Sequence, residues 1–240
     1  MKIAVCIDQI ATVSTSVDRR RAVLDASEAW PIEHARSLTQ LEAGLIHLCA
    51  VGPPAARRAL RKGLAMGADA AVHLKTPDFV RLDACSVAEV LASHLREASF
   101  DLVLFGERGD ARDGALLCGM VAGFLDRPYS TGVVGFSGRK SDMKVTRHGP
   151  DGMQTLRLRI PCMVSCCRGA GAHQIPSLQQ VVAAGRKSIE VHDVKPPDSR
   201  IQILERIPRR FQPSVKLFDG DAAEAVSGLT GALREEGLLG

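Results

Sequence analysis

The sequence predicts an α/β fold: a doubly wound, mainly parallel sheet with helices on both faces. Short apolar runs alternate with helix-like segments over the first half of the chain. These runs lack the polar alternation of a sheet with one wet face, so both faces of the sheet are expected to be buried. The chain has 240 residues, of which 45% are hydrophobic and 24% charged, so it can bury a large core.

Four strand–helix pairs are expected in order along the chain. Strands are predicted over 2–7, 45–51, 70–74 and 102–106, and helices over 30–43, 54–66, 86–97 and 115–125. The first helix is expected to start at Trp30-Pro31, because proline suits the first helical position, and to stop at Gly44. Strands joined by crossover helices pair in parallel, which gives the doubly wound sheet. Residues 11–21, rich in Ser, Thr and charge, are expected to form an excursion such as a hairpin.

The pattern changes after Pro128. Short strand-like runs over 132–136, 144–147 and 155–160 are separated by turn residues, which indicates an added β-rich segment. Residues 163–167 are expected to rejoin the main sheet.

The C-terminal part of the sequence differs from the rest in composition. Residues 195–213 combine four prolines with many charges, as linkers do, and an amphipathic helix is expected over 222–236. We therefore expect one α/β domain over 1–194 and a C-terminal arm and helix over 195–240.

Composition excludes several classes of protein. A net charge of +4 and an aromatic content of 4% argue against nucleic-acid binding. The apolar run that follows Met1-Lys2 is too short for a signal peptide, and no run reaches membrane-spanning length, so we expect a cytoplasmic protein. The seven cysteines are odd in number and lack Cys-x-x-Cys spacing, which favours reduced thiols that pack as small hydrophobes and no metal site.

The strand 102–106, the Gly-rich charged turn after it and the helix 115–125 form the candidate binding element. Backbone N–H groups at such a helix N-terminus can hold a phosphate, at the carboxyl edge of the sheet. The alternative is an ordinary strand–helix connection capped by Asp113. No Gly-x-Gly-x-x-Gly follows the first strand, which disfavours a conventional NAD-dependent enzyme. No convincing Ser-His-Asp or Cys-His arrangement is present, so we expect no catalytic residues.

Several short motifs, taken in order, resemble one family. They are Ala50-Val51-Gly52-Pro53, Leu64-Ala65-Met66-Gly67-Ala68-Asp69, Asp101-Leu102-Val103-Leu104-Phe105-Gly106, Ala122-Gly123-Phe124-Leu125-Asp126-x-Pro128, Pro176-Ser177-Leu178 and Ile189-Glu190-Val191. In order and spacing they are similar to the beta (small) subunit of electron-transfer flavoproteins. The similarity runs from Lys2 to about Val191.

The resemblance implies a fold related to adenine-nucleotide-binding domains and a heterodimer with a larger alpha subunit. In that family FAD is held mainly by the alpha subunit, and the beta subunit buries an AMP or, in electron-bifurcating members, a second FAD. The assembly carries electrons from a dehydrogenase to a membrane quinone reductase. The expected function is therefore that of an electron carrier subunit, with residues 195–240 contacting the alpha subunit.

Carried over to this chain, the family's site assigns cofactor-binding and docking residues. The candidate cofactor-binding residues are Cys6, Ile7, Asp8, Trp30, Val51, Gly52, Gly106, Arg108, Arg112, Asp113, Gly114, Ala115, Leu116 and Leu117. Leu178, near the Pro-Ser-Leu motif, is the candidate anchor for the dehydrogenase. The alternative for Leu178 is a place inside the core at a helix N-terminus.

The chain departs from the family at the nucleotide turn. Ala111 to Cys118 replace side chains that would bond phosphate and ribose, leaving backbone N–H groups, the helix dipole and Arg108 or Arg112. Asp8 replaces a lysine, and Trp30 replaces an asparagine, either stacking on adenine or filling its space. We therefore expect AMP to bind more weakly than in typical members. Residues 171–175 also differ from the family's docking segment, which points to a dehydrogenase other than the common acyl-CoA type.

Two other functions remain as alternatives. One is a nucleotide-binding regulatory module of the universal-stress type, which would lack the segment 136–191 and carry a Gly-rich phosphate motif. The other is a nucleotide-free pseudo-subunit that serves as a scaffold for an alpha partner.

Overall fold

The computed structural model describes residues 1–8, 26–76, 79, 82–107, 114–167, 175–202, 204–205 and 215–239. The chain divides into a large unit, Met1–Gln202, and a small unit, Ile203–Gly240. The expected excursion over 11–21 lies outside the described residues.

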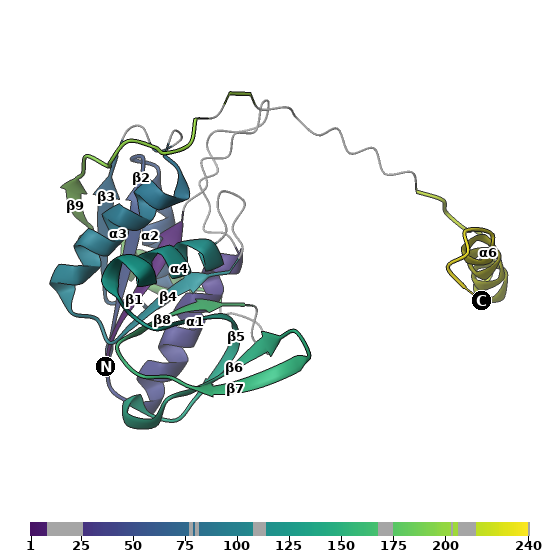
Figure 1. Ribbon diagram of the computed structural model, residues 1–240, viewed down its shortest axis with the longest axis horizontal. Coiled ribbons are helices and arrows are strands. Elements are labelled where there is room, and N and C mark those ends of the chain that lie inside the picture. The colour runs from purple at the N-terminus through teal and green to yellow at the C-terminus, as the bar shows by residue number, and fades with distance from the viewer. Residues whose placement is uncertain are drawn as a thin grey trace. The chain divides into compact units, whose positions relative to one another are not determined.

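The described part of the large unit is built on one nine-stranded sheet (Figure 1). Its strands are β1 (Lys2–Asp8), β2 (Leu45–Gly52), β3 (Ala70–Lys75), β4 (Leu102–Gly106), β5 (Tyr129–Ser137), β6 (Lys144–Gly149), β7 (Gly152–Arg157), β8 (Cys162–Cys166) and β9 (Glu190–Asp193). They lie in the order β7-β6-β5-β8-β4-β1-β2-β3-β9. The pairs β5–β6 and β6–β7 are antiparallel and the other pairs are parallel.

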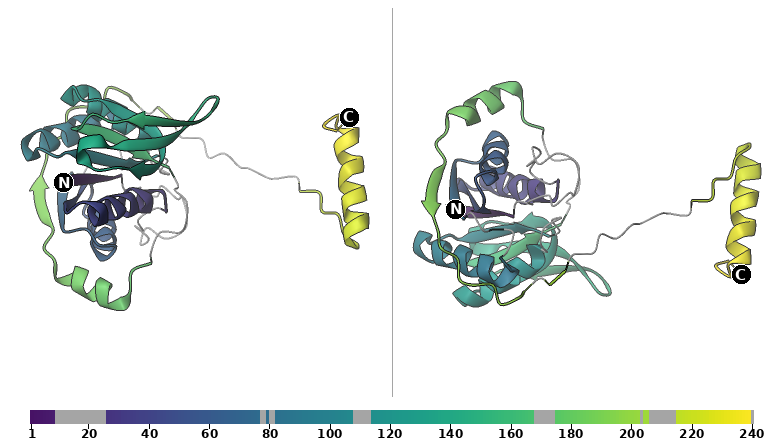
Figure 2. Two further views of the ribbon diagram at one scale, coloured as in Figure 1. Left: turned by 90° about the horizontal axis from the view of Figure 1, so that it is seen from below. Right: turned by 90° about the horizontal axis from the view of Figure 1, so that it is seen from above.

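Helices cover both faces of the sheet, which confirms the doubly wound α/β prediction. They are α1 (Ala26–Leu41), α2 (Ala56–Ala65), α3 (Ala84–Ala98), α4 (Gly114–Leu125) and α5 (Leu178–Arg186). Side chains of α1 and α2 pack with one set of strand residues, and side chains of α3 and α4 pack with the alternate set. Figure 2 shows the two helix layers and α5 lying outside α2.

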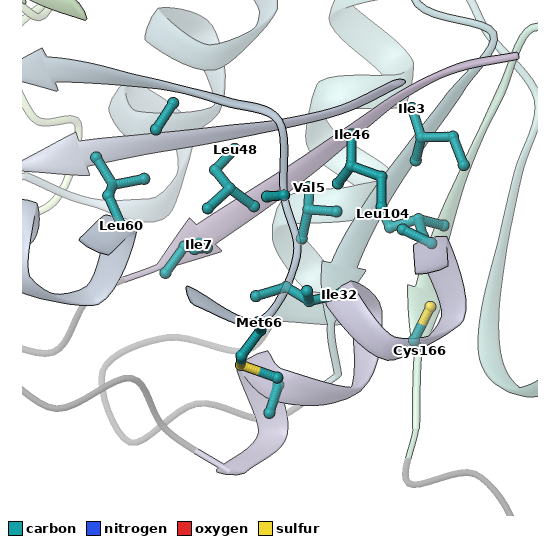
Figure 3. Close-up of a cluster of buried hydrophobic side chains, with 14 of the residues drawn as sticks. Ile3, Val5, Ile7, Ile32, Ile46, Leu48, Leu60, Met66, Leu104 and Cys166 are labelled. Atoms are coloured by element: carbon teal, nitrogen blue, oxygen red, sulfur yellow. The ribbon is translucent and has the colours of Figure 1, made fainter. Parts of the chain in front are cut away.

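Strand periodicity explains the two cores. Along β1, Ile3, Val5 and Ile7 face α1 and α2, whereas Ala4 and Cys6 face α3 and α4. Figure 3 shows the first core, where the β1 side chains meet those of neighbouring strands and of α1 and α2. The central parallel strands β1 and β4 are therefore apolar on both faces, as the unbroken apolar runs predict.

The predicted start of the first helix is wrong. The helix begins at Ala26, and Pro31 lies inside it. A proline at this position removes one intrahelical hydrogen bond, the one to the carbonyl of Ser27. The helix still extends back past Pro31 because Ala29 and Glu28 are buried against the sheet, and tertiary packing outweighs that single lost bond.

The β-rich segment forms the expected extension of the sheet. β5, β6 and β7 make an antiparallel meander at one edge, and β8 returns to lie between β5 and β4. Residues 158–160, predicted as strand, follow the end of β7. β9 adds a parallel strand beside β3 at the other edge.

Helix α5 is attached to the large unit mainly at its C-terminal end. Of its residues only Ala184 is buried. The Arg61 guanidinium of α2 donates to the carbonyl of Ala184 at 2.6 Å and also to that of Lys187. The Lys187 ammonium donates to the carbonyl of Ala68 at 2.6 Å, so three polar contacts hold the end of this helix.

The chain after β9 is tied to the start of α3. Val194 N–H donates to the carbonyl of Lys75 at 2.9 Å. The Asp83 carboxylate, which caps α3, accepts from Ser86 N–H at 2.7 Å and from Arg200 N–H at 2.7 Å. We call residues 194–200 the strap.

The small unit contains helix α6 (Ala222–Glu235), close to the predicted bounds. Asp221 and Glu224 form a reciprocal capping box at its start. Among the described helices of the chain, none has the length and apolar character that a membrane span requires.

Candidate functional site

The carboxyl ends of β1, β2 and β4 lie side by side. In register, Asp8 pairs with Val51, and Cys6 pairs with both Cys49 and Phe105. Parallel pairing therefore brings three of the predicted segments to one edge of the sheet. In an open α/β sheet this is the edge at which ligands bind.

Five of the predicted site residues line one cavity at this edge. They are Cys6, Ile7, Val51, Gly106 and Leu117, and they are joined by Glu28, Val87, Leu91 and Phe105. The cavity volume is about 10 Å³, enough for one water molecule. Leu117 and Phe105 are each only 2% exposed, so their side chains fill this part of the edge.

Glu28 is the polar side chain of this cavity that the sequence analysis missed. It lies in the first turn of α1 and is 2% exposed. A carboxylate in the first turn is favoured by the helix dipole. Burial, with a contribution from the Glu28 charge, raises the pKa values of Cys6 and Cys166 well above the ordinary value.

The buried cysteines around the site are protonated at neutral pH. Burial raises the pKa of Cys49 to about 12, and burial likewise raises the pKa of Cys118. A neutral thiol in such a place packs as a small hydrophobic group, which agrees with the sequence analysis. Among the residues that the structure describes, no cluster of His, Cys, Asp and Glu suits a metal ion.

Glu107 joins the ends of three strands beside the cavity. Its N–H donates to the carbonyl of Cys166 at 3.1 Å, and its carboxylate accepts from the Cys167 thiol. Cys167 N–H in turn donates to the carbonyl of Val133 at 2.7 Å. The ends of β4 and β8 and the middle of β5 are therefore fixed relative to one another.

Trp30 does not line the cavity. Its side chain is 7% exposed, and its ring lies 6.3 Å from the His34 ring, which lies 5.3 Å from the Phe136 ring. Burial lowers the pKa of His34, so the imidazole next to Trp30 is neutral at pH 7. This packing favours the space-filling role for Trp30 over stacking on adenine.

The remaining predicted cofactor residues have different surroundings. The Gly52 carbonyl accepts from Thr76 N–H at 3.0 Å and lies 3.0 Å from His73 Nε2. Asp8 ends β1; Gly114 and Ala115 begin α4. Leu116 in α4 is 48% exposed and does not line the cavity. The predicted residues Arg108, Arg112 and Asp113 lie outside the described residues.

The described residues do not by themselves fit AMP. A nucleotide needs far more room than one water molecule, and the described residues that line the cavity include no cation, hydroxyl or amide side chain. The one Asp or Glu side chain among them is Glu28, which offers phosphate no positive charge.

Leu178 lies on the surface, and its predicted alternative place inside the core is wrong. Ser177 caps α5 and shares a capping box with Gln180, so Leu178 is the first helical residue. Leu178 is 79% exposed and Ile175 is 88% exposed. With the half-exposed Val181 and Val182 they leave apolar side chains on the surface of this segment.

The fold and the site together define an open, doubly wound α/β protein whose candidate ligand edge lies at the carboxyl ends of β1, β2 and β4. The universal-stress alternative is disfavoured, because the segment 136–191 contributes strands β6 to β9 and helix α5. Residues 14–197 match the family model described as the electron transfer flavoprotein domain. The chain belongs to this family.

Individual proteins that are similar to this chain include electron transfer flavoprotein beta subunits and a FixA protein. The chain is 32% identical to "Electron transfer flavoprotein subunit beta" of Homo sapiens over 158 residues, which is 65% of this chain and 61% of the human protein. It is 25% identical to the subunit of that name from Bacillus subtilis over 235 residues, covering 95% and 91%. It is 26% identical to "Protein FixA" of Azotobacter vinelandii over 179 residues, covering 72% and 64%. The chain thus spans about three fifths of the length of the human relative.

Proposed function

We propose that this chain is the beta subunit of a heterodimeric electron-transfer flavoprotein and has no catalytic residues of its own. It passes electrons from a partner dehydrogenase, by way of FAD held with an alpha subunit, towards a membrane quinone reductase. FAD supplies the electron chemistry when it is bound in the heterodimer. Family membership and the names of the relatives support this proposal. The lack of a membrane-spanning helix among the described residues is consistent with the cytoplasmic location that we propose.

The observation that carries the proposal is the solvent exposure of α6. None of its residues is buried, although Val226 and Leu229 lie on it one turn apart. An amphipathic helix normally owes its stability to packing of its apolar stripe, and the described residues of the small unit do not bury this stripe. An alpha subunit that covers this stripe accounts for it, and residues 195–240 are then the arm that contacts the partner.

Co-expression with an alpha (large) subunit of an electron-transfer flavoprotein tests this proposal. We expect a heterodimer that retains FAD and buries more than roughly 2,000 Å² of total surface, as obligate interfaces do. A truncation after Gln202 serves as the control and should co-purify poorly with the large subunit. A stable monomer that binds no co-expressed alpha subunit and no flavin contradicts the proposal.

The electron donor docks, in this proposal, on the apolar residues around the start of α5. Exposed apolar anchors surrounded by polar residues carry most of the affinity of small interfaces, and Leu178 has that character. The altered residues 171–175 support a donor other than the common acyl-CoA dehydrogenases.

The substitution Leu178→Ala tests this docking surface. We expect at least an approximately tenfold slower electron transfer from the donor, since loss of an anchor costs about 2 kcal/mol. FAD content and melting temperature should stay nearly unchanged, because the side chain packs against little of the chain. Leu41 is also an exposed leucine and lies at the end of α1, so Leu41→Ala is the matched control. Equal transfer rates in both variants would exclude Leu178 as the anchor.

A further inference from the structure

A groove lined by described residues lies at the amino edge of the sheet, opposite the candidate site. Its volume is about 910 Å³. Lys140, which lines it, pairs with Asp101 at 2.7 Å, and Asp101 immediately precedes β4. Lys140 N–H also donates to the Glu42 carboxylate at 2.8 Å, just beyond the end of α1. The groove therefore sits where the parallel strands begin, next to the antiparallel meander.

Cations dominate the wall of this groove. Of the four that line it, Lys140 is paired with Asp101 and Arg157 is paired with Asp142 at 2.8 Å. The guanidinium groups of Arg139 and Arg159 form no ion pair or hydrogen bond with any described residue. Two uncompensated guanidinium groups from separate segments therefore line one groove, an arrangement suited to carboxylates.

The floor of the groove is an extended segment of alternating character. Arg157 and Arg159 are exposed, whereas Leu158 and Ile160 are half-buried and pack against the core. Leu158 N–H donates to the carbonyl of Met143 at 2.9 Å, so the segment continues the line of β7. β7 is the edge strand of the described sheet, with β6 on one side only. Edge strands can bind an extended peptide by main-chain pairing.

We propose that this groove binds an extended acidic segment of a partner protein. Carboxylates at every second position would meet Arg139 and Arg159, and the apolar residues between them would lie on Leu158 and Ile160. An extended peptide suits the groove because exposed cations and half-buried apolar residues alternate along residues 157–160, at the end of the edge strand β7. The proposal does not depend on the electron-carrier function.

Fluorescence anisotropy with a labelled peptide of alternating glutamate and valine tests this inference on the full-length chain. The double variant R139E/R159E reverses both unpaired cations. The control variant R186E/K195E makes the same change of charge at two exposed residues outside the groove that also lack partners among the described residues. We expect binding at least about tenfold weaker in the groove variant and nearly unchanged in the control. Binding should also weaken as salt rises from about 0.05 to about 0.2 M.

Further measurements distinguish the possible outcomes. Circular dichroism and melting temperature should be unchanged, and R139Q/R159Q gives a milder variant with the same expected direction. Equal weakening in groove and control variants would overturn the proposal, because it would show attraction by net charge alone. Binding to phosphatidylglycerol vesicles that is lost in the groove variant, with no peptide binding, would overturn it in favour of a membrane surface. FAD retention in the heterodimer, measured separately, tests the proposed function without reference to the peptide result.

Discussion

The carboxyl and amino edges of the parallel sheet differ in the volume of their cavities and in the charged side chains that line them. At the carboxyl edge, β1, β2 and β4 end around a cavity of about 10 Å³ that holds the buried carboxylate Glu28. At the amino edge, a groove of about 910 Å³ exposes Arg139 and Arg159, whose guanidinium groups pair with no residue that the structure describes. The first is a packed interior that contains one acidic side chain; the second is an open surface lined by cations.

The comparison indicates that the carboxyl edge of the sheet serves stability and the amino edge serves binding. Phe105 and Leu117, at the carboxyl edge, are buried in the hydrophobic core. Their side chains therefore contribute to the stability of the fold. Arg139 and Arg159 contribute little packing, so they are free to serve recognition. Substitutions at the carboxyl edge should therefore change stability, and those at the amino edge should change binding.

The largest expected effect comes from enlarging the carboxyl-edge cavity. Leu117→Ala should lower the free energy of unfolding by about 2–5 kcal/mol, because it removes buried methyl groups and leaves a larger void. Urea denaturation measures this change. Leu116→Ala, at the neighbouring exposed position, is the control and should stay within about 0.5 kcal/mol of the parent. An equal loss of unfolding free energy in both variants would contradict the conclusion that the carboxyl edge is a packed interior.

A smaller effect is expected where the strap is tied to the start of α3, next to the same edge. Asp83→Ala should lower the free energy of unfolding by about 1 kcal/mol, the usual cost of losing an N-cap. It should also speed hydrogen exchange of the Arg200 amide, which loses its acceptor. Asp221→Ala removes the equivalent cap of α6 and should leave exchange at Arg200 unchanged.

The pH dependence of the strap follows from the Asp83 carboxylate. Burial alone would raise its pKa, but hydrogen bonds from Ser86 and Arg200 outweigh burial and lower the pKa to about 2. A depressed pKa gives stability that is complete above the ordinary value and lost as the pH falls through the folded one. Protection of Arg200 should therefore persist down to about pH 4 and disappear towards pH 2. Loss of protection between pH 7 and 5 would assign the contact to another group.

The smallest expected effect concerns nucleotide at the carboxyl edge. Extracts of the purified heterodimer should contain FAD and less than one equivalent of AMP, because the described cavity offers phosphate no cation and one carboxylate. Trp30→Phe should not change the amount of AMP retained, since Trp30 packs on His34 and does not line the cavity. Chromatography of acid-released nucleotides measures both. Tightly retained, stoichiometric AMP would overturn the argument, and a second FAD would place the chain in the bifurcating branch.

Local sequence patterns predicted the bounds of the strand Leu102–Gly106 and of the next helix well, but they predicted the start of the first helix wrongly. The strand Leu102–Gly106 and the helix after it have the expected bounds within one residue, because an unbroken apolar run followed by a turn admits few alternatives. Pro31 misled the analysis, since proline favours a helix start but burial of Ala29 carried the helix further back. Glu28 was missed as a result, although an acidic residue among helix formers, just before the predicted start, was a usable signal.

Long-range contacts account for the rest. The groove combines Arg139 with Arg159 only because the meander folds the segments beside each other, which no local pattern reveals. Leu178 illustrates the same limit. Its capping signal at Ser177 can be recognised in the sequence, but its exposure depends on α5 lying outside α2.

The attachment of α5 by three polar contacts at one end has a consequence for dynamics. With a single buried residue, this helix should open locally at a free-energy cost well below that of global unfolding. Its amides should then exchange with solvent much faster than those of α3 or α4. A partner that binds the closed helix must supply the free energy of ordering it, and in return slows that exchange. Docking of an electron donor should therefore slow hydrogen exchange of the backbone amides along Leu178–Arg186, whether or not electron transfer takes place.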